Sequence, residues 1–231
     1  MRKDSNKNDD PASAAVALQS ADAFRSLALP FLDLMGTDID VPPNRVMENL
    51  GGLSASATLL SLSVELYLKA LRLLEGQDPL YTHDLSLLFE GLSESTRASV
   101  VKVYDSIPIP PTGTPASFIL ELSLGEFDDP QPCPSKILAD NSLISVLKRS
   151  KDAFQTWRYL YEKGKRGRTI TFIYEYRNLD RAAEAVRQHV APAVQVSFAK
   201  NSGGTSPLPQ VSSGFIQFPH EFYNSFSLFM T

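Results

Sequence analysis

Apolar residues recur at intervals of three and four along most of the chain, the pattern of helices that bury one face. The clearest stripe covers residues 53–74, and we expect a helix that Asn44 caps and that Gly76 ends. A second stripe predicts a helix over Ala12–Met35, which Pro30 either kinks or ends early. These two segments predict the centre of a helical bundle.

Weaker patterns predict the remaining elements. Thr169–Tyr174 is rich in β-branched and aromatic residues, and we expect a short extended piece there. The proline-rich stretches Ile107–Pro115 and Gly125–Ser135 predict irregular connections. The other expected helices are a short one capped by Thr82, one that starts at Ser93 or Ser95, a short one over Ala116–Leu124, a long one over Ile137–Glu162, and a final one from Tyr176 to Val190 or Phe198.

This order of elements predicts an all-α bundle of about five to seven helices with flexible termini. Residues 1–11 are polar and predict disorder, residues 12–200 form the helical domain, and residues 201–214 are a Ser/Gly/Pro-rich linker. Residues 215–231 form an aromatic tail that carries Phe215, Phe218, Phe222, Tyr223, Phe226 and Phe229. Because exposed aromatic residues are sticky, the tail either docks on its own bundle, docks on a partner, or stays disordered.

Composition and charge refine this view. The formal net charge of −4 gives no overall attraction to nucleic acid, but residues 145–168 carry eight basic and two acidic residues. Cys133 is the sole cysteine, so no disulfide forms within the chain. The polar N-terminus predicts no secretion signal, and the charges at Glu65, Lys69 and Arg72 argue against a membrane span. We therefore expect a cytoplasmic protein that does not enter a membrane.

Motifs of the common enzyme classes are missing from the sequence. It contains no P-loop pattern G-x-x-x-x-G-K-[ST], no G-x-G-x-x-G and no G-x-S-x-G. His83, His189 and His220 lie far apart, and Cys133 stands alone among prolines. We therefore expect neither a bound metal nor a cofactor.

Three segments carry motifs in the order and spacing of one known family. They are Ser63–Leu71, with the pattern S-x-E-L-x-L-K-A; Thr82–Leu85, with H-D-L and a further leucine at Leu88; and Phe154–Glu162, with F-x-x-W-R-Y-x-Y-E. Together they resemble the HEPN superfamily, helical domains associated with RNA and nucleotides, over roughly residues 44–195. The resemblance implies a helical bundle, a homodimer and a role in bacterial stress or defence.

Glu65 lies at the margin of the apolar stripe, where a carboxylate usually finds a polar partner. His83 and Arg158 are the expected partners, and Lys69 is spaced for an i,i+4 pair with Glu65. We expect these four residues to form a polar cluster. The cluster either only joins three helices or also takes part in ligand binding or catalysis.

Many HEPN members carry an R-x4-6-H motif, which implies metal-independent RNA cleavage with histidine in proton transfer and arginine on the phosphate. Here Arg177 has no histidine four to six residues later, and His189 follows Arg181 after seven intervening residues. Arg177, Arg181 and His189 are therefore off-pattern catalytic candidates. The departure favours a protein without enzymatic activity.

Residues 163–168 join glycines to the cations Lys163, Lys165, Arg166 and Arg168. Such a segment is either a solvated loop or a contact for phosphate or RNA. The sequence thus predicts a non-catalytic module that binds RNA or a nucleotide. The alternatives are a divergent metal-independent ribonuclease and a bundle that binds only proteins, for which the Phe215–Phe229 tail is the expected contact.

Overall fold

The computed structural model describes residues 11–35, 43–78, 80–108, 118–123, 140–151, 153–158 and 169–201. Residues 1–10 of the predicted disordered N-terminus (1–11), the cations of residues 163–168, residues 202–214 of the predicted linker (201–214) and the aromatic tail lie outside the described residues. Pro11 and Asn201 belong to helices instead, at the start of the first and the end of the last.

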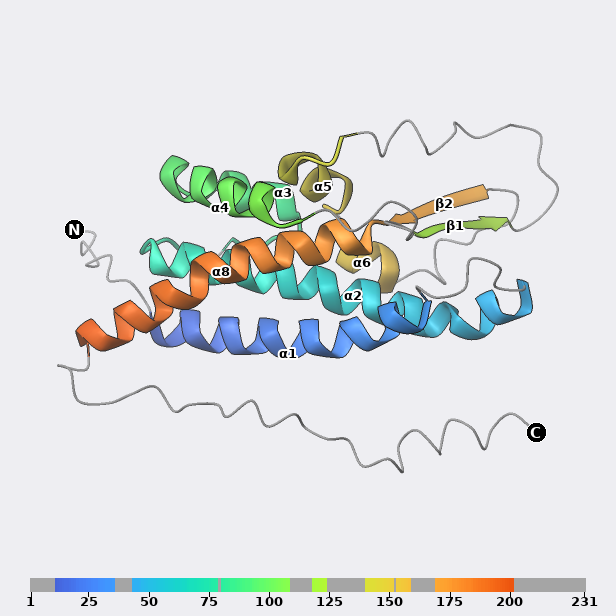
Figure 1. Ribbon diagram of the computed structural model, residues 1–231, viewed down its shortest axis with the longest axis horizontal. Helices are drawn as coiled ribbons and strands as arrows, with labels where there is room; N and C mark the ends of the chain where they lie inside the picture. The colour runs from blue at the N-terminus through green and yellow to red at the C-terminus, as the bar shows by residue number, and fades with distance from the viewer. Residues whose placement is uncertain are drawn as a thin grey trace, which may run out of the picture.

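The described chain is a helical bundle with a two-stranded sheet at one end, and this confirms the helical bundle predicted from the sequence (Figure 1). Three long helices, α1, α2 and α8, lie side by side, and the shorter helices α3, α4 and α5 lie across the bundle from α1 (Figure 1). The elements are α1 (Pro11–Met35), α2 (Pro43–Leu74), α3 (Leu85–Glu90), α4 (Glu94–Ser106), β1 (Phe118–Ser123), α5 (Leu143–Arg149), α6 (Ala153–Arg158), β2 (Thr169–Tyr174) and α8 (Tyr176–Asn201).

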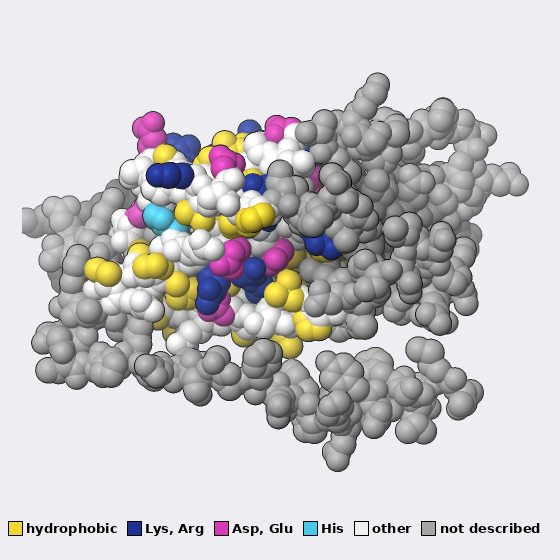
Figure 2. All heavy atoms as spheres, in the orientation of Figure 1, with side chains coloured by type: hydrophobic (Ala, Val, Ile, Leu, Met, Phe, Trp, Pro, Cys, Tyr) yellow, Lys and Arg dark blue, Asp and Glu magenta, His cyan; other side chains and the backbone are white. Residues whose placement is uncertain are grey.

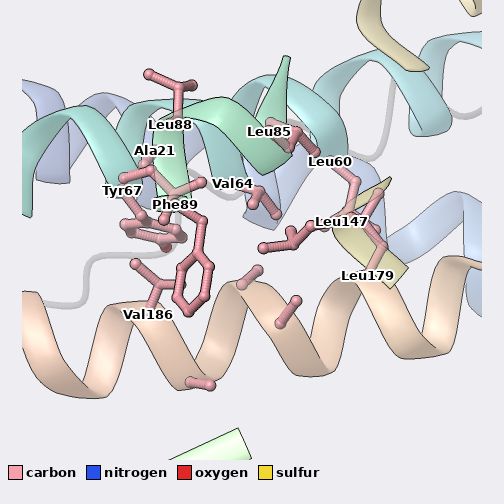
Figure 3. Packing of buried hydrophobic residues seen from close by; sticks show 14 of the residues in the cluster. Ala21, Leu60, Val64, Tyr67, Leu85, Leu88, Phe89, Leu147, Leu179 and Val186 are labelled. Carbon is pink, nitrogen blue, oxygen red and sulfur yellow. The ribbon is translucent and has the colours of Figure 1, made fainter. Parts of the chain in front are cut away.

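Small residues let the long helices approach closely. On α1 the buried positions facing the core are Ala14, Ala21 and Ala28, and α8 contributes Ala182 and Ala183. The larger apolar side chains come mainly from α2, α8 and α3, with two leucines of α5, and fill the space between these helices (Figure 3). The labelled residues of this core are Ala21, Leu60, Val64, Tyr67, Leu85, Leu88, Phe89, Leu147, Leu179 and Val186.

Most helix boundaries follow local chemistry. Gly76 adopts a positive φ of 65° just after α2, so glycine ends this helix as predicted. Ser93 caps α4 through a hydrogen bond from Thr96 N. Pro30 lies inside α1, which continues to Met35, so the proline does not end the helix early.

Two predicted caps are wrong. Asn44 lies inside α2, because the helix begins at Pro43, whose fixed φ suits the first helical position. Asp84, not Thr82, caps α3: its side chain accepts hydrogen bonds from Ser86 N and Leu87 N. Thr82 Oγ1 instead accepts a hydrogen bond from Asp84 N and thereby supports the cap from outside the helix.

The short helix predicted over Ala116–Leu124 is wrong, because Phe118–Ser123 forms β1. It pairs antiparallel with β2, the extended piece predicted at Thr169–Tyr174, from Phe118 opposite Tyr174 to Ser123 opposite Thr169. An isolated helix of this length is barely stable in water, whereas a strand finds its hydrogen-bond partners across the sheet. Tyr174 Oη lies 3.2 Å from Ser56 Oγ, which joins the sheet to α2.

The long helix predicted over Ile137–Glu162 is also wrong. It is divided into α5 and α6 at Ser150, the C-cap of α5. Arg149, the last residue of α5, binds Glu175 in the turn before α8, with Nε–Oε1 and Nη2–Oε2 distances of 2.8 and 3.0 Å. This long-range pair fixes the end of α5, and no local sequence pattern reports it.

Candidate functional site

A buried carboxylate on α2 binds two basic side chains. Glu65 Oε1 accepts a hydrogen bond from Lys69 Nζ over 2.7 Å, and Glu65 Oε2 lies 2.9 Å from His83 Nδ1. The Glu65 side chain is 3% exposed, whereas that of His83 is 41% exposed. Because a carboxylate only accepts hydrogen bonds, Nδ1 of His83 carries the proton in this pair and donates a hydrogen bond to Glu65 Oε2.

The second nitrogen of His83 therefore lies on the side of the ring away from Glu65, in a side chain that is partly exposed. Phe154 of α6 contributes to the orientation of this ring, since the two rings lie 4.7 Å apart between centroids and are tilted by 30°. In such a carboxylate–histidine pair the second nitrogen is the acceptor of the ring, so it is suited to accept a hydrogen bond from a ligand hydroxyl or amino group, or to proton transfer. The structure thus brings together Glu65, Lys69 and His83, and Phe154 joins them.

The three segments that carry the family motifs pack as one unit. Helix α6 packs against α2, and the His83 turn lies against both through Glu65 and Phe154. Trp157 and Arg158 lie on α6, but their side chains are outside the described part of the structure. The predicted contact between Arg158 and Glu65 stays a prediction.

Further cations surround the start and end of α3. Lys151 lies close enough to Asp84 to act on its ionisation. Burial opposes ionisation of Asp84, but the hydrogen bonds from Ser86 and Leu87 and the charge of Lys151 together lower its pKa. Lys148 Nζ lies 3.7 Å from Glu90 Oε1, an exposed pair. We call Lys69, His83, Lys148, Lys151 and Phe154 the His83 face.

Arg181, a catalytic candidate, is buried and joins α8 to α4. Its Nη2 donates a hydrogen bond to the carbonyl oxygen of Tyr104 over 2.7 Å, and its guanidinium carbon lies 3.9 Å from the centroid of the Tyr104 ring. This combined hydrogen bond and cation–π contact is a packing arrangement. It holds the guanidinium inside the protein, away from any phosphate in solvent.

Arg177 and His189 lie on the same helix but far apart. Arg177 Nε donates a hydrogen bond to Tyr176 Oη over 2.9 Å, and His189 is half-buried further along α8. They are 12 positions apart in the sequence, which corresponds to about 18 Å along a helix axis. His189 and Arg181 are about 12 Å apart along the axis by the same rule. Within this chain, neither arginine lies beside His189 as a single catalytic centre requires.

A second polar cluster, at the N-terminal end of α8, is absent from the sequence prediction. Glu175 is buried and pairs with Arg149, whose Nη2 also donates to the carbonyl oxygen of Asp140 over 2.7 Å. Asn178 Nδ2 donates to Asn141 Oδ1 over 3.2 Å. Hydrogen bonds from Ser145 and Ser142 lower the pKa of Asp140 to about 2. The cluster joins α5 and the residues just before it to the start of α8. In the sequence, its one local indication is a glutamate just before a helix.

An ionic network joins α1 to α8 on the face that Figure 2 shows, where basic and acidic side chains lie next to one another between apolar ones. Arg25 binds Asp180 over 2.7 Å and also binds Glu184. Asp22 accepts hydrogen bonds from Arg187 Nε over 2.7 Å and from the hydroxyl of Tyr67. Two arginines pair with three carboxylates here, so the network holds the helices together and its formal charge of about −1 does not attract a polyanion.

Comparison of the chain with family models, with curated proteins and with solved structures finds no match. Among the described residues, no helix has the length and apolar character to cross a membrane. The same residues contain no group of three or more histidine, cysteine, aspartate or glutamate side chains that could hold a metal. The arrangement of the His83 face is therefore the main basis for a functional proposal.

Proposed function

We propose that this chain is a HEPN-like helical module that binds RNA or a nucleotide at the His83 face and does not cleave it. The observation that carries the proposal is the half-exposed His83 ring, oriented by the buried Glu65 carboxylate and by Phe154. An oriented imidazole accepts a hydrogen bond at Nε2 from a ribose hydroxyl or a base amino group, and in its imidazolium form it donates one to phosphate. Phe154 lies against the ring.

The charge balance of the face shows where the attraction must originate. Among the described residues, Glu65, Asp84 and Glu90 offset the charges of Lys69, Lys151 and Lys148. The positive excess that a polyanion requires must come from Lys163, Lys165, Arg166 and Arg168. These cations follow α6 in the sequence, and α6 carries Phe154 beside His83. The proposal therefore combines the oriented His83 ring with the positive charge that residues 163–168 carry in the sequence.

The positions of the catalytic candidates support binding without cleavage. Arg181 is held by Tyr104, and Arg177 lies about 18 Å from His189 along α8. A single phosphate spans only a few ångströms, so these groups do not act on it together within one chain. The resemblance also implies a homodimer, which sedimentation of the purified chain at several concentrations tests.

The test is fluorescence anisotropy of a labelled single-stranded RNA oligonucleotide, titrated with the full chain at several salt concentrations. We expect affinity to fall steeply with salt and the double variant Lys165→Ala/Arg166→Ala to weaken binding by about tenfold or more. His83→Ala should weaken binding too, with less change in the salt dependence. Lys102→Ala, an exposed cation on α4, is the matched control and should bind as the wild type does.

Two results would overturn the proposal. Equal RNA affinity of the wild type and the Lys165→Ala/Arg166→Ala variant would exclude this segment as the charge supply. Cleavage of the oligonucleotide in the presence of a chelator, abolished by His189→Ala, would show that the protein is a ribonuclease.

A further inference from the structure

A shallow apolar groove follows the seam between α1 and α2. Its floor and walls come from Val16, Ala17 and Phe24 of α1 and from Leu62 and Leu66 of α2. Val16 is 64% exposed, although it is a large apolar residue in the middle of the rim. The described residues of the lining include no charged side chain, so the groove is suited to an apolar partner and not to a polyanion.

The groove lies on the side of α1 that faces away from α8. Asp22 and Arg25 point from α1 toward α8, where they bind Arg187, Asp180 and Glu184. At 100° per residue, Val16, Ser20 and Phe24 lie on nearly the opposite side of α1. A segment that leaves the end of α8 must therefore pass around α1 to reach the groove.

The chain leaves α8 at the right place for this path. Helix α8 runs antiparallel to α1, since Asp22 pairs with Arg187 while Arg25 pairs with Asp180, earlier in α8. The end of α8 at Asn201 and the start of α1 at Pro11 thus lie at the same end of the bundle (Figure 1). The groove begins at this end, at Ala12.

The sequence beyond α8 has the length and the pattern to fill the groove. Residues 202–214 span up to about 45 Å when extended, several times the width of a helix. The phenylalanines 215, 218, 222, 226 and 229 then follow at intervals of three and four, the spacing of one helical face. A helix over 218–229 is about 17 Å long, and the groove from Ala12 to Phe24 is about 18 Å long.

We infer that the aromatic tail of residues 215–231 docks in the α1–α2 groove of its own chain, with the phenylalanine stripe against Val16, Phe24 and Leu66. Each buried aromatic side chain removes roughly 150–250 Å² from water, and the groove offers an apolar surface against which this stripe is buried. The groove is thereby occupied by a segment of the same polypeptide, and the tail is not available to a partner protein.

Limited chymotrypsin digestion of the full chain tests this inference, because chymotrypsin cleaves after the aromatic residues of the tail. We expect tail cleavage, followed by mass spectrometry, to be about tenfold or more faster in Val16→Asp than in the wild type. Ile144→Asp places the same charge at an apolar residue of α5 that is 44% exposed, across the bundle from the groove. This control should be cleaved at the wild-type rate.

Cross-linking identifies which chain supplies the tail. In a Cys133→Ser background, Val16→Cys and Ser225→Cys should form a disulfide within one chain, and Lys102→Cys with Ser225→Cys should not. Disulfide-linked dimers from the first pair would show that the tail of a second copy fills the groove. Equal cleavage rates in the wild type and Val16→Asp, or no disulfide from the first pair, would overturn the inference altogether.

Discussion

Glu65 shows what one residue contributes when it lies at the edge of a core. Its carboxylate is almost completely withdrawn from water and accepts hydrogen bonds from Lys69 and His83. Removing one partner of a buried ion pair lowers the free energy of unfolding by more than the intact pair contributes to it, because the remaining charge is left without a partner. Lys69 and His83 are both partly exposed, however, so water can solvate them after such a change.

Glu65→Gln keeps the shape of this side chain and removes its charge. We expect the free energy of unfolding to fall by roughly 1–3 kcal/mol, because the amide no longer attracts the ammonium group of Lys69. Urea denaturation monitored by circular dichroism measures this change. Glu90→Gln, which removes an exposed carboxylate, should change stability by less than about 0.5 kcal/mol. Equal effects of the two substitutions would contradict the structural role of Glu65.

At the scale of elements, α8 is attached to α4 by one buried arginine. Arg181 supplies both a hydrogen bond to the Tyr104 carbonyl group and a cation over the Tyr104 ring. We expect Arg181→Ala to lower the free energy of unfolding by about 2–3 kcal/mol, since both interactions and the packed stem of the side chain are lost. Gln195→Ala, exposed on the same helix, is the control for thermal unfolding measurements.

A second substitution at this position, Arg181→Lys, distinguishes a packing role of Arg181 from a catalytic one. If Arg181 acted in catalysis, Arg181→Lys would retain stability while nuclease activity disappeared. In the packing role, Arg181→Lys lowers stability, because lysine lacks the planar group that covers the Tyr104 ring.

The ion pairs between α1 and α8 make the stability of the bundle depend on pH. Burial opposes ionisation of Glu184, but hydrogen bonds from Gln188 and Arg25 and the nearby charge of Arg25 outweigh it and lower the pKa of Glu184. A carboxylate with a lowered pKa in the folded state stabilises the fold above its unfolded pKa, near 4.5, and this stabilisation is lost as pH falls through the folded pKa.

Glu184→Gln removes this titration. We expect the variant to be less stable than the wild type at pH 7, by a few tenths of a kcal/mol to about 1 kcal/mol, and this difference to shrink as pH falls below 4.5, the ordinary pKa of glutamate. Urea midpoints at pH 7, 5 and 3 measure it. A difference that stays constant over this pH range would show that Glu184 contributes through packing alone.

For the whole molecule, the sequence predicts best where a contact depends on local spacing. The stripe of α2, the glycine that ends it and the i,i+4 spacing of Glu65 and Lys69 all lie within a few turns of one helix. The Arg149–Glu175 pair joins residues 26 positions apart in the sequence, and no helical or strand periodicity predicts such a contact. Similarly, Phe118–Ser123 carries too few residues to distinguish helix from strand, and its pairing with β2 decides its structure.

The buried residues of α1, α2, α3, α4, α5 and α8 belong to one connected core. Such a core should unfold as a single unit, and α6 should unfold with it because Phe154 lies against His83.

Trp157, the sole tryptophan, is on α6 and reports on this helix alone, whereas far-ultraviolet circular dichroism reports on all helices. We expect the two signals to follow the same urea transition. We also expect Val64→Ala, which leaves a cavity in the core, to shift both midpoints equally. An earlier fluorescence transition would show that α6 unfolds independently, and the His83 face would then lose the support on which RNA binding is proposed to depend.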